Sequence, residues 1–444
     1  MKFKFLFLFC YFLCLYTKEC LTKNYRNYSL IRGIPVNEDH LKFFQNLSEI
    51  YKVNYWRLPG MVHRPTEFII APPYKKDFVR RADLAGVYYS TIMEDVQKAL
   101  DMQTVKSYIR RKMESFDWSS FFRLHDIYAW IRDLERQYPK ILQVKIIGKS
   151  VEKRDILAVR IAHKAKRPKV FVEGGIHARE WIAPAFVTYF LHQILTAAGE
   201  QNGTLKPIAE AYEWYFVPVI NPDGYDYTHV KDRMHRKNMN NVDLNRNFGI
   251  AFGTVGVSDE RSSETYCGPH AFSEPESKAM RDFVYSHNKD LKYYFAFHSY
   301  GQYMIIPYTH TKQHSGNYDT VHKMGLKAAS HIAARYGTQY EVGTAYDTVG
   351  YMTSGVSGCW VKKSFEVPYV VTFELRDQGQ HGFALPPKQI LPTCKETMDG
   401  IVSLISYKAD TMAKAKTAIK GGQAALMVDS FVMWNCLFII KHFY

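Results

Sequence analysis

Three apolar segments of this sequence each lead into ionisable residues, and this pattern constrains the fold more than any other feature. The segments are residues 169–174, followed by His177 and Glu180; residues 291–297, followed by His298; and residues 369–373, followed by Glu374. Short apolar runs separated by longer helical patterns indicate the buried strands of an α/β domain. Ligands bind outside the carboxyl ends of the strands in such sheets, so we expect these ionisable residues to meet at one edge.

Composition narrows the class of protein further. A chain of 444 residues that is 47% hydrophobic is too apolar to be disordered, and its length favours two or three domains. Seven cysteines are too few for a disulfide scaffold. The formal net charge of +15 leaves open nucleic acid, an anionic membrane or a heparin-like polymer as partners. Composition alone does not choose among them.

The amino-terminal end indicates export. Basic residues are followed by an apolar run over residues 5–16, which is too short to cross a bilayer as a helix. We interpret residues 1–20 as a signal peptide and expect a secreted, extracellular protein. The alternative is a buried amino-terminal helix. Up to five cysteines then remain in an oxidising compartment, and their spacing does not reveal a pairing.

The carboxyl-terminal tail, residues 409–444, allows several interpretations. Its apolar stretch over residues 424–440 is interrupted by Asp429 and Asn435. The stretch could be a removable lipid-anchor signal with attachment near Gly421 or Gly422, which would place the protein at the cell surface. A poorly spanning hydrophobic tail and an incorrectly assigned end of the gene are the other two interpretations.

Residues 22–111 predict a small leading α+β domain that ends at a basic junction. Short β-rich runs alternate there with amphipathic helical patterns. Arg110, Arg111 and Lys112 then offer a target for a trypsin-like protease. The alternative is a solvated linker, but a small domain ahead of a basic junction in a secreted chain suggests a pro-segment that is removed on activation.

The ionisable residues at the strand ends suit metal-assisted hydrolysis. Two imidazoles and one carboxylate, from His177, His298 and Glu180, make a three-ligand zinc site that leaves one position for water. The pair His177 and Glu180 alone could be a chance match, and His298 alone would be better explained as a core histidine hydrogen-bonded to the backbone. Hydrolysis also needs a general base, for which Glu374 is the candidate, and a cation for the oxyanion. Arg233, Arg236 and Arg246 offer that cation, and the alternative for each is an ordinary surface arginine.

Seven motifs, read together and in order, resemble the zinc carboxypeptidases of the pancreatic A/B type. The motifs are His177–Trp181, Asn221–Tyr225, Arg236–Asn238, Asp243–Phe248, Ser263–Gly268, His298–Tyr300 and Thr372–Asp377. The resemblance covers residues 22–408. It implies a mixed, mostly parallel central sheet with helices on both faces at residues 115–408, preceded by a ferredoxin-like pro-domain. It also implies a monomeric zymogen of an exopeptidase that acts on peptide and protein C-termini.

The resemblance assigns the metal and the general base. It implies that His177, Glu180 and His298 hold one zinc ion, and that Asp243 orients a ligand histidine. Glu374 would activate the attacking water and then protonate the leaving amine.

Substrate contacts follow from the same motifs. Arg236 would stabilise the tetrahedral oxyanion, and Asn245, Arg246 and Tyr351 would bind the substrate's free C-terminal carboxylate. Arg179 would contact the peptide further upstream.

The specificity pocket departs from the family's pattern. Counting back from Trp360 places Gly358 where B-type members carry an acidic residue and A-type members an apolar one. Cys359 replaces the aspartate that is usual beside it. The expected lining is neutral, formed by Gly358, Thr309, Tyr346, Thr353 and Thr372. A pocket without a carboxylate does not offset the desolvation of Lys or Arg, so we expect apolar or aromatic C-terminal residues to be preferred.

Two further hypotheses remain beside this one. A catalytically inactive binding protein with the same fold would be expected to lack the base, the oxyanion arginine or a metal ligand, whereas all of these are present. The positive net charge could also bind the protein to a heparin-like polymer or a membrane surface, and such binding is compatible with catalysis. No sequence motif suggests nucleic-acid binding.

Overall fold

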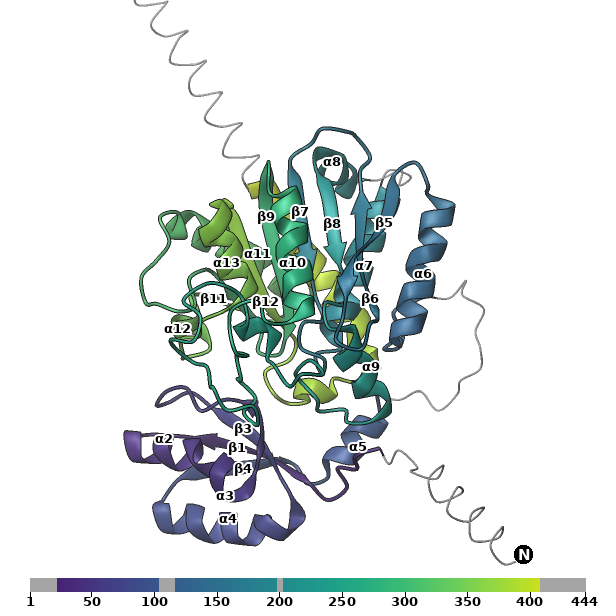
Figure 1. Cartoon of the computed structure of the whole chain (residues 1–444). Helices are drawn as coiled ribbons and strands as arrows, with labels where there is room; N and C mark the ends of the chain where they lie inside the picture. The colour runs from purple at the N-terminus through teal and green to yellow at the C-terminus, as the bar shows by residue number, and fades with distance from the viewer. Residues whose placement is uncertain (1–21, 104–115, 198–202, 408–444) are drawn as a thin grey trace, which may run out of the picture.

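A computed structural model describes residues 22–103, 116–197 and 203–407, which form a small amino-terminal unit and a larger α/β unit (Figure 1). The predicted signal peptide, the basic junction at Arg110–Lys112 and the tail from residue 409 lie outside these residues. Within the described ranges, no helix combines the length and apolarity that a membrane span requires.

The small unit is a four-stranded sheet with helices packed on it. The strands run in the order β2-β3-β1-β4 and every neighbouring pair is antiparallel. Its strands are β1 (Ser29–Ile34), β2 (Asn54–Arg57), β3 (Thr66–Ile70) and β4 (Tyr88–Met93); its helices are α2 (Glu38–Gln45), α3 (Leu47–Tyr51), α4 (Pro72–Ala85) and α5 (Val96–Asp101). Phe44, Phe68 and Phe78 are fully buried in its core. The predicted small α+β domain is therefore confirmed.

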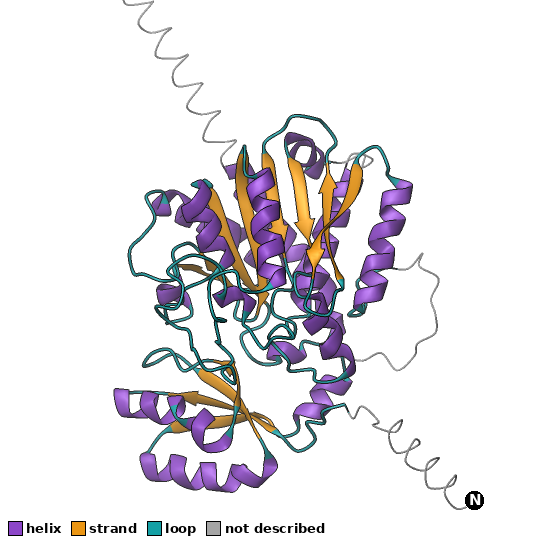
Figure 2. Cartoon of the chain, viewed as in Figure 1, coloured by secondary structure: helices purple, strands orange, loops and turns teal. Residues whose placement is uncertain are grey.

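The large unit is built on an eight-stranded mixed sheet (Figure 2). Its order is β11-β10-β12-β9-β7-β8-β6-β5, with β9 parallel to both β7 and β12 and the β6 pairings antiparallel. The strands are β5 (Leu142–Lys149), β6 (Asp155–Ile161), β7 (Lys169–Glu173), β8 (Glu213–Val217), β9 (Leu291–Ser299), β10 (Tyr303–Ile305), β11 (Glu341–Gly343) and β12 (Tyr369–Leu375).

Helices cover both faces of this sheet, as predicted. They are α6 (Leu124–Gln137), α7 (Ile182–Thr196), α8 (Leu205–Ala211), α9 (Pro222–Val230), α10 (Pro275–His287), α11 (Tyr318–Tyr336), α12 (Ala345–Thr348) and α13 (Ser357–Phe365), with a further helix over residues 390–407. Alternate strand residues point to opposite faces. Phe295 thus packs in the core beneath α6 and α7, and its neighbour Tyr294 packs in the core beneath α10 and α13. Burial on both faces explains why the strands are continuously apolar.

The carboxyl ends of β7, β9 and β12 meet at the sheet edge that faces the small unit (Figure 1). The parallel register of β9 and β12 pairs His298 with Glu374. Three segments far apart in sequence therefore deliver their ionisable residues to one place, as the sequence pattern predicted.

Candidate active site

His177, Glu180 and His298 form a buried cluster at this edge. Gly175 turns the chain after β7 with a φ of +64°, and a Cβ there would come within 3.0 Å of the Val219 backbone. This turn directs His177 and Glu180 toward His298 on β9. Their side chains are 5% or less exposed.

The spacing of the three side chains fits a metal ion. Nδ1 of His177 lies 2.8 Å from Oε1 of Glu180, Nδ1 of His298 lies 3.1 Å from Oε2 of Glu180, and the two Nδ1 atoms are 3.2 Å apart. Zinc bonds of about 2.1 Å in a tetrahedron place neighbouring ligand atoms about 3.4 Å apart. The donor set and its spacing therefore suit zinc with an open position.

Asp243 supports the cluster from behind. Its Oδ1 lies 3.0 Å from Nε2 of His177, and its Oδ2 accepts hydrogen bonds from Nε and Nη2 of Arg236 at 3.2 and 2.9 Å. Burial would raise the pKa of Asp243, but Arg236, Arg246 and His177 outweigh it and hold this pKa well below its usual range. Asp243 is thus an ionised carboxylate that fixes both a ligand histidine and an arginine.

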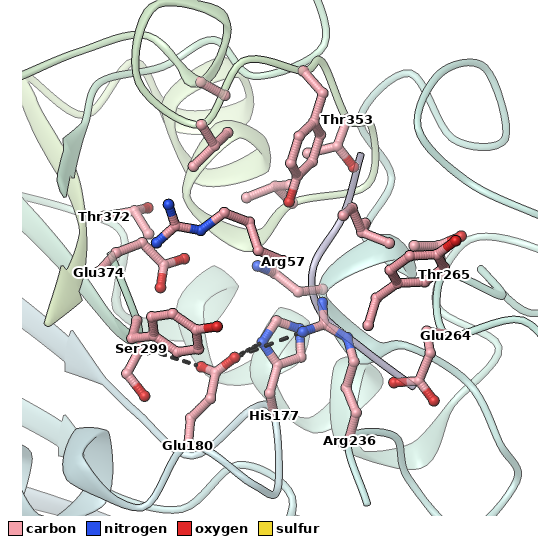
Figure 3. A pocket seen from close by; sticks show the side chains of 18 of the residues that line it. Arg57, His177, Glu180, Arg236, Glu264, Thr265, Ser299, Thr353, Thr372 and Glu374 are labelled. Carbon is pink, nitrogen blue, oxygen red and sulfur yellow. Dashed lines mark hydrogen bonds and ion pairs between the residues drawn. The ribbon is translucent and has the colours of Figure 1, made fainter. Parts of the chain in front are cut away.

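Glu374 lies beside the cluster, at the end of β12. Its side chain lines the cleft with Glu180 and Arg236 (Figure 3). Burial raises the pKa of Glu374, and the nearby Glu180 carboxylate adds to the shift. A carboxyl group with a raised pKa beside a metal cluster is suited to accept and return a proton.

A second buried carboxylate, Glu173, supports the same region and was missed in the sequence. Its Oε1 accepts a hydrogen bond from the Ser357 hydroxyl at 2.5 Å, and its other oxygen accepts one from the Tyr294 hydroxyl. The Ser357 backbone N–H donates to Oδ1 of Asn245 at 3.0 Å. Glu173 ends β7 ahead of the first motif, and only that position could have drawn attention to it.

Arg246 and Tyr351 line the cleft together with Asn245. Gly355 packs directly on Arg246, since a Cβ there would come within 2.1 Å of the Arg246 carbonyl oxygen, and its φ is +73°. Glycine is therefore required at this position, and the Arg246 backbone is held in place. Nη1 of Arg246 donates to the Asn245 carbonyl at 2.9 Å.

One part of the cleft is lined by neutral side chains. These are Ile305, Thr309, Ala345, Val349, Thr353, Val356 and Thr372. The predicted Thr309, Thr353 and Thr372 are thus in the lining, whereas Tyr346 is not part of it. Gly358 is not among the lining residues but is next to one of them, since a Cβ at this residue would meet Val370 Cγ1 at 3.2 Å and Thr372 Oγ1 at 3.4 Å.

The small unit enters the same cleft through β2. Tyr55, Trp56, Arg57 and Leu58 line it, and Figure 3 shows Arg57 beside the residues of the large unit. Trp56 packs against the rings of Tyr300 and Phe383 at centroid distances of 6.3 and 5.4 Å. The sequence predicted this strand but did not indicate that it faces the site.

Arg179 is held by the small unit. Its Nη1 donates to Oδ1 of Asn54 and its Nη2 to the Tyr55 carbonyl, both at 3.0 Å. Glu67 of the small unit makes a second contact with the large unit. It is fully buried and accepts a hydrogen bond from the Tyr300 hydroxyl of the large unit, and another from Arg32 of its own unit at 2.7 Å.

Comparisons with known proteins agree with this geometry. The family described as "Zinc carboxypeptidase" matches residues 127–400, and the one described as "Carboxypeptidase activation peptide" matches residues 31–103. The chain is similar to zinc carboxypeptidase A 1 of Anopheles gambiae, with 35% identity over 391 residues that cover 86% of this chain and 89% of that protein.

Two solved structures resemble the fold over most of the chain. The crystal structure of thrombin activatable fibrinolysis inhibitor has a TM-score of 0.80 at 28% identity, covering 86% of this chain and 98% of that one. The carboxypeptidase A of Helicoverpa armigera has a TM-score of 0.76 at 26% identity, covering 86% and 97%.

Proposed function

The chain belongs to the zinc carboxypeptidase family, with that family's activation peptide ahead of the hydrolase domain, and from this we propose that it is a secreted zymogen that prefers neutral C-terminal residues. The mature enzyme removes the last residue of peptides and proteins, favouring apolar or aromatic side chains. The neutral lining of the cleft beside Arg246 carries the proposed preference.

His177, Glu180 and His298 would hold a zinc ion, which as a Lewis acid would lower the pKa of water and polarise the scissile carbonyl. Asp243 keeps His177 oriented. Glu374 accepts a proton from the attacking water and delivers it to the leaving amine. Its raised pKa makes this carboxylate a stronger base, which favours the first of these transfers.

Arg236 and the residues around Arg246 bind the negatively charged groups of the substrate, which are the developing oxyanion and the terminal carboxylate. Arg236 is fixed by Asp243 and faces the cleft, where its guanidinium stabilises the developing oxyanion. Asn245, Arg246 and Tyr351 bind the terminal carboxylate, which restricts cleavage to the last peptide bond. An arginine is suited to this because it binds a carboxylate with two parallel hydrogen bonds.

The side chain of the departing residue enters the neutral part of the cleft. Three threonine side chains and four apolar ones line it, so a charged side chain would lose its hydration without gaining an ionic partner. Gly358 contributes to this preference because, having no side chain, it leaves Thr372 exposed to the cleft; it does not contact the departing residue itself.

Latency follows from the position of β2. Arg179, which we propose contacts the peptide upstream, donates its hydrogen bonds to Asn54 and Tyr55. Substrate and pro-segment therefore compete for the same donors. Cleavage at Arg110–Lys112 by a trypsin-like protease would cut the covalent link and let the pro-segment leave.

The test is a cleavage profile after trypsin activation, over blocked peptides that differ only in their last residue. Release of Phe and Leu that is abolished by a zinc chelator would support the proposal. Faster release of Arg, Lys or Asp would contradict the proposed preference, and no release of any residue would contradict the hydrolase.

A further inference from the structure

The end of the sheet opposite the cleft carries a strongly basic loop that catalysis does not use. Residues 163–169, which join β6 to β7, read His-Lys-Ala-Lys-Arg-Pro-Lys. Lys164, Lys166 and Arg167 are exposed. Four cationic side chains in seven residues concentrate positive charge at one sheet end.

Neighbouring segments bring more lysines to this loop. The Ala162 N–H donates to the Ile141 carbonyl at 2.9 Å, which places the exposed Lys140 beside the loop. Lys206, exposed on α8, acts together with Lys164 and His163 to lower the pKa of Glu210.

The start of β9 extends the surface on the other side. The backbone N–H of Lys169 donates to the Asp290 carbonyl at 2.9 Å, and its Nζ donates to the His287 carbonyl at 3.2 Å. Lys289, also exposed, is next to Asp290. We call Lys140, Lys164, Lys166, Arg167, Lys169, Lys206 and Lys289 the basic end.

Little acidic charge offsets the basic end. Glu210 pairs with Lys164 at 2.6 Å, Glu213 pairs with Arg160 at 3.1 Å, and the exposed Asp290 lies next to Lys289. Within the described part of the chain, no acidic side chain forms an ion pair with Lys140, Lys166, Arg167, Lys206 or Lys289. An excess of cations is therefore left facing solvent.

We propose that the basic end is a binding surface for a linear sulfated polysaccharide. Its members lie at the ends of the adjacent strands β9, β7, β8, β6 and β5, or on α8 beside them. Strands spaced about 4.8 Å apart spread such a row over roughly 19 Å. A row of fixed cations of this length matches an extended polymer that carries a sulfate or carboxylate on every unit.

The composition of the loop separates this partner from two others. Residues 163–169 contain no Phe, Tyr or Trp on which a nucleic-acid base could stack. Their least polar members are Ala165 and Pro168, so the loop offers no large apolar side chain to a lipid bilayer.

The surface is available in both forms of the enzyme. In Figure 1, α8 lies at the end of the sheet away from the small unit, which covers the other end. Polysaccharide binding is therefore expected to be independent of activation and of substrate.

The test uses the full-length zymogen and heparin as the probe. The variant Lys164→Glu/Lys166→Glu/Arg167→Glu is compared with Lys278→Glu/Lys388→Glu/Lys395→Glu, which makes the same change in net charge. The control lysines are exposed; Lys278 is in the first turn of α10, at the opposite helix end from His287. Peptide release after activation, equal in the wild type and both variants, verifies folding.

We expect the loop variant to bind heparin about tenfold more weakly or worse, as if up to three exposed ion pairs were lost, and the control to bind like the wild type. Desulfated heparin, duplex DNA and phosphatidylserine vesicles should bind the wild type at least about tenfold more weakly at equal ionic strength. Equal losses in the two variants would overturn the proposed location. DNA or vesicles that bind as tightly as heparin would overturn the proposed partner.

Discussion

Nη2 of Arg179 donates a hydrogen bond to the Tyr55 carbonyl at 3.0 Å, so an arginine that lines the cleft is satisfied by the pro-segment. The contact is to backbone and does not depend on the side chain of Tyr55. Specific anchoring of the pro-segment must therefore come from its other contacts, among them the hydrogen bond that the buried carboxylate of Glu67 accepts from the Tyr300 hydroxyl.

Glu67→Ala should weaken the hold of the cleaved pro-segment on the enzyme. The change leaves the buried Tyr300 hydroxyl without its acceptor in the pro-segment, at a cost of roughly 2 kcal/mol or more, which corresponds to at least about 30-fold in the dissociation constant. After trypsin cleavage, the pro-segment is left in the sample and the mixture is diluted stepwise, so that the pro-segment dissociates. Because the variant binds its pro-segment more weakly, it should reach full activity at a higher enzyme concentration than the wild type. Glu94→Ala, at a carboxylate that is 75% exposed, is the control and should not differ from wild type.

Glu374→Gln should remove turnover and leave the metal in place. Proton transfer by a positioned carboxylate contributes about 10²- to 10⁴-fold, so kcat should fall by at least about 100-fold. Zinc content, measured by elemental analysis, should stay at one ion per chain. Glu366→Gln, at an exposed residue, is the matched control. If the Glu374 variant kept wild-type kcat, its role as the base would be ruled out.

Asp243→Asn should weaken zinc binding while all three ligands remain. Loss of a carboxylate behind a ligand histidine typically costs about 10- to 100-fold in metal affinity. Competition with a chelator of known affinity measures the change. Asp259→Asn, at an exposed position, should bind zinc like the wild type. Unchanged affinity in the Asp243 variant would show that its contact with His177 has no influence on the metal.

Thr353→Asp should bring release of C-terminal Arg and Lys into the measurable range. The new carboxylate would face the neutral part of the cleft and give a cationic side chain the partner that it lacks. Thr353→Asn has the same size without the charge, so only the aspartate should change the ratio of kcat/KM for Arg to that for Phe. Equal ratios in the two variants would mean that the departing side chain does not reach Thr353.

Glu276 should make the fold less stable as the pH rises. Burial raises the pKa of Glu276 to about 7, so the folded state binds this proton more tightly than the unfolded chain does. Its contribution is fully present below pH 4.5 and is lost as the pH rises to about 7, by up to roughly 3 kcal/mol. In urea titrations at pH 5 and pH 8, the stability of Glu276→Gln relative to wild type should increase with pH. A constant difference would contradict the shift.

Strand ends and motif residues were predictable because they depend on local patterns. The apolar runs before His177, His298 and Glu374 are the strands β7, β9 and β12, and their parallel arrangement was enough to bring these side chains together. From the sequence we could therefore predict both the chemical type of each residue and the edge of the sheet at which it lies.

The contacts that depend on packing between distant segments were not predictable. Gly358 was expected to form the floor of the pocket, but whether a residue lines a cavity depends on how α13 packs against β12. Glu67 and Arg179 meet the opposite unit through surfaces that have no periodicity in either segment. The net charge was visible from the start, but its concentration at 163–169 became meaningful only when Lys140, Lys206 and Lys289 were placed beside it.

Thr372 and Glu374 are alternate residues of β12, and both line the cleft on the same side of the strand. In the proposed mechanism the general base and one residue that contacts the departing side chain therefore share a strand, whereas Thr309 and Thr353, which line the same part of the cleft, lie in loops. Substitutions in these loops could therefore change the substrate preference of the enzyme without displacing the Glu374 carboxylate. Homologues of this chain should accordingly differ most in the loops around 309 and 353 and least at the end of β12.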